Sequence, residues 1–386
     1  MKQVSFLHTA DLHLDAPFSS LGDEVKACRR RRNELEACLG RITQRVQEAG
    51  INILIISGDL FEDKYVKGST ILKVKNLFTE IYNTEIIITP GNHDPLSEKS
   101  FYRSTAWGGN VHVLEDSKQV LYLEKYNTCV YNLGVKNNVR MDIGQISGME
   151  IAKDRFNILL FHGTVDIPFE EDNYNSITSK ELFSLNMDYI ALGHMHCYCE
   201  YKNESTVMIN PGSPEPLGFD EEGEHGYVQG LLSMSEDYTK QHDIRLIRDA
   251  ARHYHNIDVN ISDCYGDSEV IEKICPVGQA ESTYQFGFKG TDLYRITLTG
   301  FISRKYSPDL GYIAEILSGR CFYINLRNQT LAKFEYEYYL EDPGIKGEFV
   351  RRILDRQEGE ISQEKLDTLF LAMQYGLQAL ENERVD

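Results

Sequence analysis

The sequence predicts an α/β domain built on a parallel sheet, and three observations favour this fold class. Short apolar runs rich in β-branched residues alternate with helical stretches over roughly the first 210 residues. A polar segment containing Asp, Asn, His or Gly follows each run at once. Hydrophobic residues make up 41% of the chain and charged residues 26%, which is enough apolar side chain for a sizeable core.

Six apolar runs are expected to form the strands of this sheet. They are Val4 to Leu7, Ile53 to Ile56, Ile86 to Ile88, Ile158 to Phe161, Tyr189 to Leu192 and Val207 to Ile209. Sheets of this kind hold their sites beyond the carboxyl ends of the strands. The polar segments after these runs are therefore the expected place for chemistry.

A helix is expected between the first two strands, from Arg29 to Ala49, and it opens with four consecutive arginines. We expect these arginines on a solvated helix face beside acidic neighbours. Contact with phosphate groups is the alternative.

The chain is expected to divide into a large α/β domain over 1–245, a smaller α+β cap over 246–342 and a helical tail over 343–386. The cap is inferred from strand, helix and strand segments that carry no metal-type motif. These segments are Leu293 to Phe301, Pro308 to Leu317 and Cys321 to Leu326.

An apolar stripe in the tail follows the helical spacing i, i+3, i+4, i+7, i+11 and i+14. It consists of Leu366, Leu369, Phe370, Met373, Leu377 and Leu380. Such a stripe packs on its own protein or docks on a partner's helix, and exposure of part of it would favour the partner.

The net charge of −19 opposes unaided binding to DNA, because a protein that binds DNA alone presents a basic face. Eight dilute, irregularly spaced cysteines indicate reduced thiols. Cys197 and Cys199 are interpreted as strand packing, with metal ligation as the alternative. No run approaches the roughly 18 apolar residues of a membrane span, so we expect a cytoplasmic protein without membrane contact.

Five short segments carry residues suited to metal chemistry. They are Asp11-Leu12-His13, Gly58-Asp59-Leu60, Gly91-Asn92-His93-Asp94, His162-Gly163 and Gly193-His194-Met195-His196. A single residue between two of these side chains lets both point the same way, since alternate residues share a face of a strand. Carboxylate, carboxamide and imidazole ligands together suit manganese, iron or zinc.

Seven candidate ligands are too many for one tetrahedral ion, so the sequence predicts two divalent metal ions that share one bridging carboxylate. They are Asp11, His13, Asp59, Asn92, His162, His194 and His196. The histidines outside the five segments are expected to be ordinary. These are His8, His112, His225, His242, His253 and His255.

The ordered set D-x-H, G-D-x, G-N-H-D, H-G and G-H-x-H resembles the calcineurin-like metallophosphoesterase superfamily over about residues 1 to 215. Within it, the lead from Phe6 to Phe18 and the stretch from Asn210 to Glu215 are similar to the DNA-repair exonuclease branch, with its SbcD-like and YhaO-like members. The tail around 347–352 and 375–377 is a looser match to the YhaO-like chains. The resemblance implies a four-layer α/β/β/α sandwich with the cap and tail appended.

Carried over position by position, the resemblance implies the metal ligands. The first metal would be held by Asp11, His13, Asp59 and His196, and the second by Asp59, Asn92, His162 and His194. His93 matches the family's catalytic histidine, which contacts the scissile phosphate and assists the leaving oxygen.

Glu62 departs from the pattern, because several members of the exonuclease branch have a histidine three residues after the bridging aspartate. We expect this carboxylate to lie within hydrogen-bond distance of His93 and to favour its charged form. Asp94 is the competing partner, although its adjacency to His93 favours a local role in the turn.

The resemblance implies a repair-type DNA exonuclease that hydrolyses phosphodiester bonds with metal-activated water, using manganese, or alternatively iron or zinc. It also implies a coiled-coil ATPase subunit of the SbcC type that binds the helical tail, and it allows a homodimer. A phosphatase or small-molecule phosphodiesterase on the same dinuclear site is the alternative. A non-catalytic scaffold is the third hypothesis, and its signature would be lost ligands, of which the sequence has none.

Overall fold

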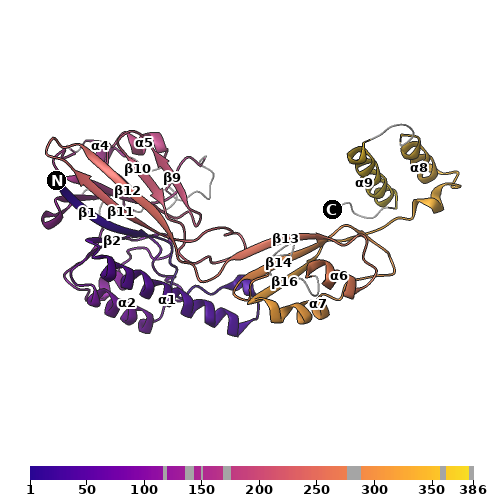
Figure 1. Cartoon of the computed structure of the whole chain (residues 1–386), viewed down its shortest axis with the longest axis horizontal. Coiled ribbons are helices and arrows are strands. Elements are labelled where there is room, and N and C mark those ends of the chain that lie inside the picture. The colour runs from indigo at the N-terminus through magenta and orange to yellow at the C-terminus, as the bar shows by residue number, and fades with distance from the viewer. Residues whose placement is uncertain are drawn as a thin grey trace. The chain divides into compact units, whose positions relative to one another are not determined.

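The computed structural model describes residues 1–115, 120–134, 143–148, 151–167, 175–275, 288–356 and 362–381. The chain separates into two compact units (Figure 1). The first unit comprises Met1–His255 with Thr291–Tyr294, and the second comprises Asn256–Gly290 with Arg295–Asp386. Every candidate metal ligand lies in the first unit.

One six-stranded sheet of the first unit has the strand order β12-β11-β1-β2-β3-β4. The strands are β1 (Lys2–Thr9), β2 (Ile53–Ser57), β3 (Glu85–Thr89), β4 (Val111–Val113), β11 (Gly226–Met234) and β12 (Lys240–Arg248). Strands β1 to β4 pair in parallel, and β11 and β12 extend the sheet in antiparallel fashion. All of β2 is buried, as expected for a parallel strand that is covered on both faces.

The other six-stranded sheet has the order β5-β6-β7-β8-β10-β9. Its strands are β5 (Leu121–Leu123), β6 (Thr128–Asn132), β7 (Phe156–His162), β8 (Tyr189–Gly193), β9 (Cys199–Lys202) and β10 (Val207–Asn210). The four central strands are parallel, and β5 and β9 form antiparallel edges.

The two sheets face each other and are flanked by helices, which confirms the α/β/β/α sandwich. One core cluster joins Ile55 of β2 to Ile158 of β7 between the sheets. A second cluster packs Leu182 on the outer face of the second sheet, against Ile190 of β8. Figure 1 shows α1 (Val25–Ala49) and α2 (Gly68–Glu80) beside the first sheet, and α4 (Gly144–Ser147) and α5 (Ser179–Phe183) beside the second.

All six predicted strands are present, as β1, β2, β3, β7, β8 and β10. The sequence interpretation missed the short or edge strands β4, β5 and β9, the antiparallel pair β11 and β12, and the fully buried parallel strand β6. The pattern of β12, KQHDIRLIR, is rich in charge, because the strand lies at the end of its sheet and its residues are only partly covered. Apolar runs therefore revealed most of the buried centre of each sheet and left out its edges. The buried strand β6 was missed because its sequence, TCVYN, has polar residues at both ends of a short apolar run.

The solvated-face prediction is wrong for Arg31, which is fully buried within α1. Its Nη1 lies 2.6 Å from Glu34 Oε2 and 3.3 Å from Glu215 Oε2, and its Nη2 donates to Pro216 O at 2.9 Å. A buried guanidinium needs such partners, and Glu215 comes from a segment far away in the sequence. The neighbours Arg29 and Arg30 are exposed, as expected.

The second unit contains a three-stranded sheet of order β13-β14-β16, whose first two strands begin in the first unit. Its strands are β13 (Tyr254–Asn260), β14 (Leu293–Thr299) and β16 (Tyr323–Asn328), and its helices are α6 (Asp267–Ile274) and α7 (Leu310–Leu317). The predicted strand, helix and strand are thus present as β14, α7 and β16. Further short elements include β15 (Phe301–Ile302) and β17 (Leu331–Ala332) in this unit and α3 (Phe101–Ser104) in the first.

The chain then forms α8 (Ile345–Asp355) and α9 (Gln363–Leu380). Three residues of the apolar stripe, Leu369, Met373 and Leu377, are buried in a cluster with Val350, Ile353 and Phe334. The other three, Leu366, Phe370 and Leu380, are half-buried. None of the helices in the described part of the chain combines the length and apolar character of a membrane span.

Candidate metal centre

The nine residues predicted for the site follow or end parallel strands of both sheets. Asp11 and His13 follow β1, Asp59 and Glu62 follow β2, Asn92 and His93 follow β3, His162 ends β7, and His194 and His196 follow β8. The carboxyl ends of the two parallel sheets meet, so segments distant in the sequence deliver their side chains to one place.

Four of these residues have a left-handed backbone, which non-glycine residues rarely adopt. The φ angles are 51° at Asp11, 45° at His13, 50° at Asp59 and 92° at His194. Such conformations cost about 1–3 kcal/mol each and persist only where the surroundings enforce them. Hydrogen bonds from Asp11 N to Gly58 O (3.1 Å) and from His13 N to Asp59 O (2.9 Å) do so here.

Asp59 lies between two groups of candidate ligands. Its Oδ2 is 3.6 Å from Nε2 of His13 on one side and 3.3 Å from Nε2 of His162 on the other. Its Oδ1 accepts a hydrogen bond from the backbone N of His93 at 2.8 Å. This is the position that a carboxylate shared by two metal ions would need.

The first group consists of Asp11, His13 and His196, each of which offers a ligand atom within 4.8 Å of the others. Nε2 of His196 lies 4.0 Å from Oδ1 of Asp11. Nε2 of His13 is buried, and it has no hydrogen-bond partner among the described residues. A buried, unpartnered imidazole nitrogen costs free energy unless a ligand satisfies it, and a cation would do so.

The second group consists of Asp59, His162 and His194, with Asn92 beside them. Asn92 Oδ1 is 2.9 Å from His162 Nε2 and 3.1 Å from His194 Nδ1. His162 Nδ1 is 2.8 Å from the carbonyl of Ser57, which can only accept, so Nδ1 carries a proton and Nε2 is turned toward the group. Oxygen and nitrogen atoms thus converge as they do around a metal.

The electrostatic field of the site favours positive charge. Burial acts to lower the pKa of His162, but the charge of Asp59, the hydrogen bond to Asp59, the charge of Asp11 and the bond to the Ser57 carbonyl together raise the pKa to about 9. For His196, burial is likewise outweighed by the hydrogen bond to Glu221 and the charge of Asp11, and the pKa rises to about 9. Bound cations would replace the protons that these imidazoles hold.

His194 behaves in the opposite way. Burial, followed by the charge of His162, lowers its pKa to about 4. Burial acts to raise the pKa of Asp59, but the charge of His162 and the hydrogen bond from it lower that pKa below its usual range. His194 is therefore neutral and Asp59 ionised near pH 7, which are the protonation states that metal ligands require.

Glu62 and His93 form the predicted contact. His93 Nδ1 lies 3.1 Å from Oε1 and 3.0 Å from Oε2 of Glu62. The His93 side chain is 42% exposed, whereas that of Glu62 is only 12% exposed. The hydrogen bond to Glu62 raises the pKa of His93. Glu62 also lies 3.2 Å from His13 Nδ1, so one carboxylate orients both imidazoles.

Asp94 has the local role expected for it. Its Oδ1 accepts from Gly91 N at 2.7 Å, and its Oδ2 accepts from Phe61 N at 3.1 Å and from the Tyr102 hydroxyl at 2.5 Å. These bonds fix the turn that carries Asn92 and His93.

Sequence reasoning missed Glu221, whose Oε1 lies 2.7 Å from Nδ1 of His196. Glu221 stands in the acidic run Asp220-Glu221-Glu222 and belongs to no recognisable motif. Its burial, at 5% exposure, distinguishes it from an ordinary acidic loop residue, and only the tertiary structure reveals that burial. Among the described residues, Cys197 and Cys199 belong neither to these two groups of metal-type donors nor to a third group, which consists of His13, Glu62 and His93.

His8 is buried in the core, 2.8 Å from the Tyr189 hydroxyl and 2.9 Å from Ser57 Oγ. Burial lowers its pKa to about 3, so it is a neutral link between the sheets.

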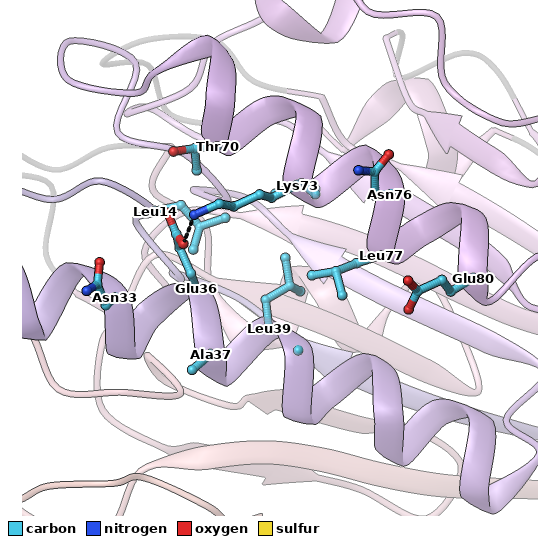
Figure 2. Close-up of a pocket in the computed structure, with 12 residues that line it drawn as sticks. Leu14, Asn33, Glu36, Ala37, Leu39, Thr70, Lys73, Asn76, Leu77 and Glu80 are labelled. Atoms are coloured by element: carbon cyan, nitrogen blue, oxygen red, sulfur yellow. Dashed lines mark hydrogen bonds and ion pairs between the residues drawn. The ribbon is translucent and has the colours of Figure 1, made fainter.

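A separate hollow of about 420 Å³ lies between α1 and α2 (Figure 2). Its lining includes Leu14, which follows His13 in the chain, but none of the nine candidate residues. In Figure 2 the Lys73 side chain reaches across to Glu36, with Nζ 2.5 Å from Oε2. This hollow is therefore distinct from the metal centre.

Comparison with known proteins gives a family match and two curated relatives. Residues 4–198 match the family model described as calcineurin-like phosphoesterase. The metallophosphoesterase YhaO of Bacillus subtilis is 25% identical over 256 residues, which cover 63% of this chain and 62% of the relative. The DNA double-strand break repair protein Mre11 of Methanopyrus kandleri is 26% identical over 245 residues, covering 56% and 51%. The chain thus spans between half and two thirds of the length of these relatives.

Solved structures with a similar arrangement share little sequence with the chain. The protein TT1561 of Thermus thermophilus is 14% identical, with a TM-score of 0.39, covering 62% of this chain and 98% of that one. A dimetal phosphatase from Danio rerio is 9% identical, with a TM-score of 0.37, covering 59% and 94%.

Proposed function

Since the chain belongs to the calcineurin-like phosphoesterase family, we propose that it is a two-metal phosphodiesterase that acts on DNA as a repair-type exonuclease. The observation that carries the hydrolase part of the proposal is the pairing of exposed His93 with Glu62 beside two adjoining groups of metal-type donors. The choice of DNA as the substrate is supported instead by the similarity to Mre11. A general acid next to a dinuclear centre is the arrangement that phosphoester hydrolysis requires.

The residues present fit two divalent ions. The unpartnered Nε2 of His13 and the converging atoms around Asn92 Oδ1 are acceptors that a cation would satisfy. Asp11, His13 and His196 would hold one ion, and Asn92, His162 and His194 the other, with Asp59 shared. When bound, the two ions supply Lewis-acid charge and lower the pKa of water at the phosphate. Manganese suits the mixed oxygen and nitrogen donors, with iron or zinc as alternatives.

His93 and Glu62 supply the proton chemistry. The Glu62 carboxylate accepts from Nδ1 of His93, so that Nε2 of the imidazolium can face solvent and substrate. From there His93 contacts the scissile phosphate and donates a proton to the leaving oxygen. Glu62 keeps His93 protonated and restricts its ring to one orientation.

Similarity to a protein named for DNA double-strand break repair supports DNA as the substrate. The net charge of −19 opposes unaided association with a polyanion, so we propose that a partner delivers the DNA. A coiled-coil ATPase subunit of the SbcC type fits this role. Its docking site would be the tail, where Leu371 and Tyr375 of α9 are 44% and 38% exposed beside the half-buried Phe370.

A phosphatase or small-molecule phosphodiesterase is the second candidate. The carboxylate of Glu62 beside His93 favours it, because phosphatase members of the superfamily place an aspartate there, whereas several exonuclease members have histidine. The same metal ligands would serve either substrate.

The test is an assay of the purified full chain with manganese on four substrates: single-stranded DNA, double-stranded DNA, a generic phosphodiester and a phosphomonoester. We expect the two DNA substrates and the generic phosphodiester to be hydrolysed. This hydrolysis should require both the metal and His93. Preference for the monoester would replace the proposal by the phosphatase. Inactivity on every substrate, with two metals bound, would favour a scaffold.

A further inference from the structure

His196 is oriented by a side chain that comes from a different segment of the fold. Its Nδ1 lies 2.7 Å from Glu221 Oε1, and its Nε2 faces Asp11 Oδ1 at 4.0 Å. An ionised carboxylate can only accept, so Nδ1 of His196 carries the proton and Nε2 is left as the ligand atom when the ring is neutral. The ring of His162 in the second group is held instead by the backbone carbonyl of Ser57.

Glu221 is itself fixed on its other oxygen. Oε2 accepts from the Ser213 hydroxyl at 2.7 Å and from Leu217 N at 3.0 Å. Ser213 N in turn donates to His196 O at 3.0 Å. The segment from Ser213 to Glu221 therefore holds His196 by both its backbone and its ring.

The same segment is anchored to α1 through Glu215. This buried carboxylate lies 3.3 Å from Arg31 Nη1 and 2.9 Å from Arg41 Nη2, and it also accepts from Ala251 N at 2.9 Å. A buried carboxylate with these partners resists displacement, because moving it would leave charges unpaired. The anchor ties the segment that carries Glu221 to α1.

We propose that Glu221 is a positioning residue for His196 and that it sets the affinity of the metal ion held with Asp11 and His13. The proposal rests on the two-metal function above. Carboxylates that accept from a ligand histidine orient its ring and raise its basicity, and losing one typically weakens metal binding about 10- to 100-fold. The carbonyl of Ser57, and not Glu221, orients the ring of His162. Loss of Glu221 should therefore leave the metal affinity of the second group unchanged.

The experiment is a manganese titration of the full chain, followed by electron paramagnetic resonance, in the wild type and in the variants E221A and E221Q. We expect the wild type to bind two ions that give an exchange-coupled spectrum. In E221A one ion binds about 10- to 100-fold more weakly while the other is unchanged, so isolated manganese dominates at low metal. E221Q keeps a hydrogen-bond acceptor but has no charge, so its manganese affinity should lie between that of the wild type and that of E221A.

The matched control is E222Q, because Glu222 is the exposed neighbour of Glu221 and carries the same charge. It should bind both ions as the wild type does. Unchanged binding in E221A, equal weakening of both ions, or the same effect in E222Q would overturn the proposal. A variant that loses its folded structure in a thermal melt also counts against it, because Glu221 would then be a structural residue. A wild type that binds fewer than two ions contradicts the proposed function instead.

Discussion

Gly91→Ala tests the position of Asp59 without altering any metal ligand. A Cβ at Gly91 would lie 2.1 Å from Asp59 Oδ1 and 2.6 Å from Asp59 N. Cβ contacts below 3.0 Å are essentially never observed, so the two segments must separate by about 1 Å. Backbone atoms are involved, and a change of side-chain rotamer therefore cannot relieve the clash.

The consequence for metal binding follows from ligand geometry. Metal–ligand distances tolerate about 0.2 Å, so a displacement of about 1 Å removes Asp59 from both ions. Overpacking of this kind also costs about 1–3 kcal/mol of stability. We expect Gly91→Ala to remain folded, with a lower Tm, to retain fewer than two metal ions and to lose phosphodiester hydrolysis.

The measurements are metal content after dialysis and the Tm by calorimetry. Gly40→Ala is the matched control, because Gly40 lies within α1 and a Cβ there meets nothing within 4 Å. Replacing a glycine inside a helix by alanine stabilises by about 0.5–1 kcal/mol. Two metal ions bound with normal affinity in Gly91→Ala would refute the placement of Asp59 between the two groups.

Three further predictions concern single side chains. His93→Ala should keep both metal ions and lose about 10² to 10⁴ in rate, as checked by metal content and turnover; near-normal turnover would remove His93 from the mechanism. Glu62→Gln should move the alkaline limb of the kcat/KM profile to lower pH, because Glu62 raises the pKa of His93, which must stay protonated; an unmoved limb would refute the pair. Burial acts to raise the pKa of Glu34, but the hydrogen bonds and charges of Arg252 and Arg31 outweigh it and lower the pKa. The ionised Glu34 therefore stabilises the folded state fully above about pH 4.5, and this contribution is lost as the pH falls. Glu34→Gln should therefore weaken stability at neutral pH and flatten its decline in acid, measured by denaturant titration at several pH values; an unchanged acid profile would contradict this linkage.

The sequence by itself determined the centre of the fold and the candidate ligands. Runs such as Ile53 to Ile56 are short, β-branched and apolar because a parallel strand covered on both faces excludes polar residues. Residues such as Asp59 follow these runs at once, and parallel strands end at one edge. Local pattern alone therefore indicates which side chains meet, although it says nothing of their distances.

Only the tertiary structure decided how those side chains are held. Glu221 meets His196 from 25 residues away and Glu215 meets Arg31 from 184 residues away, through a segment whose acidic sequence looks solvated. The same holds for the tail, where the i, i+3, i+4 spacing predicts an apolar stripe. The spacing does not predict that Leu369 is buried whereas Phe370 is half-buried. The spacing of apolar residues indicates only which side of a helix or strand is buried. Which segment covers that side depends on how separate parts of the chain pack together.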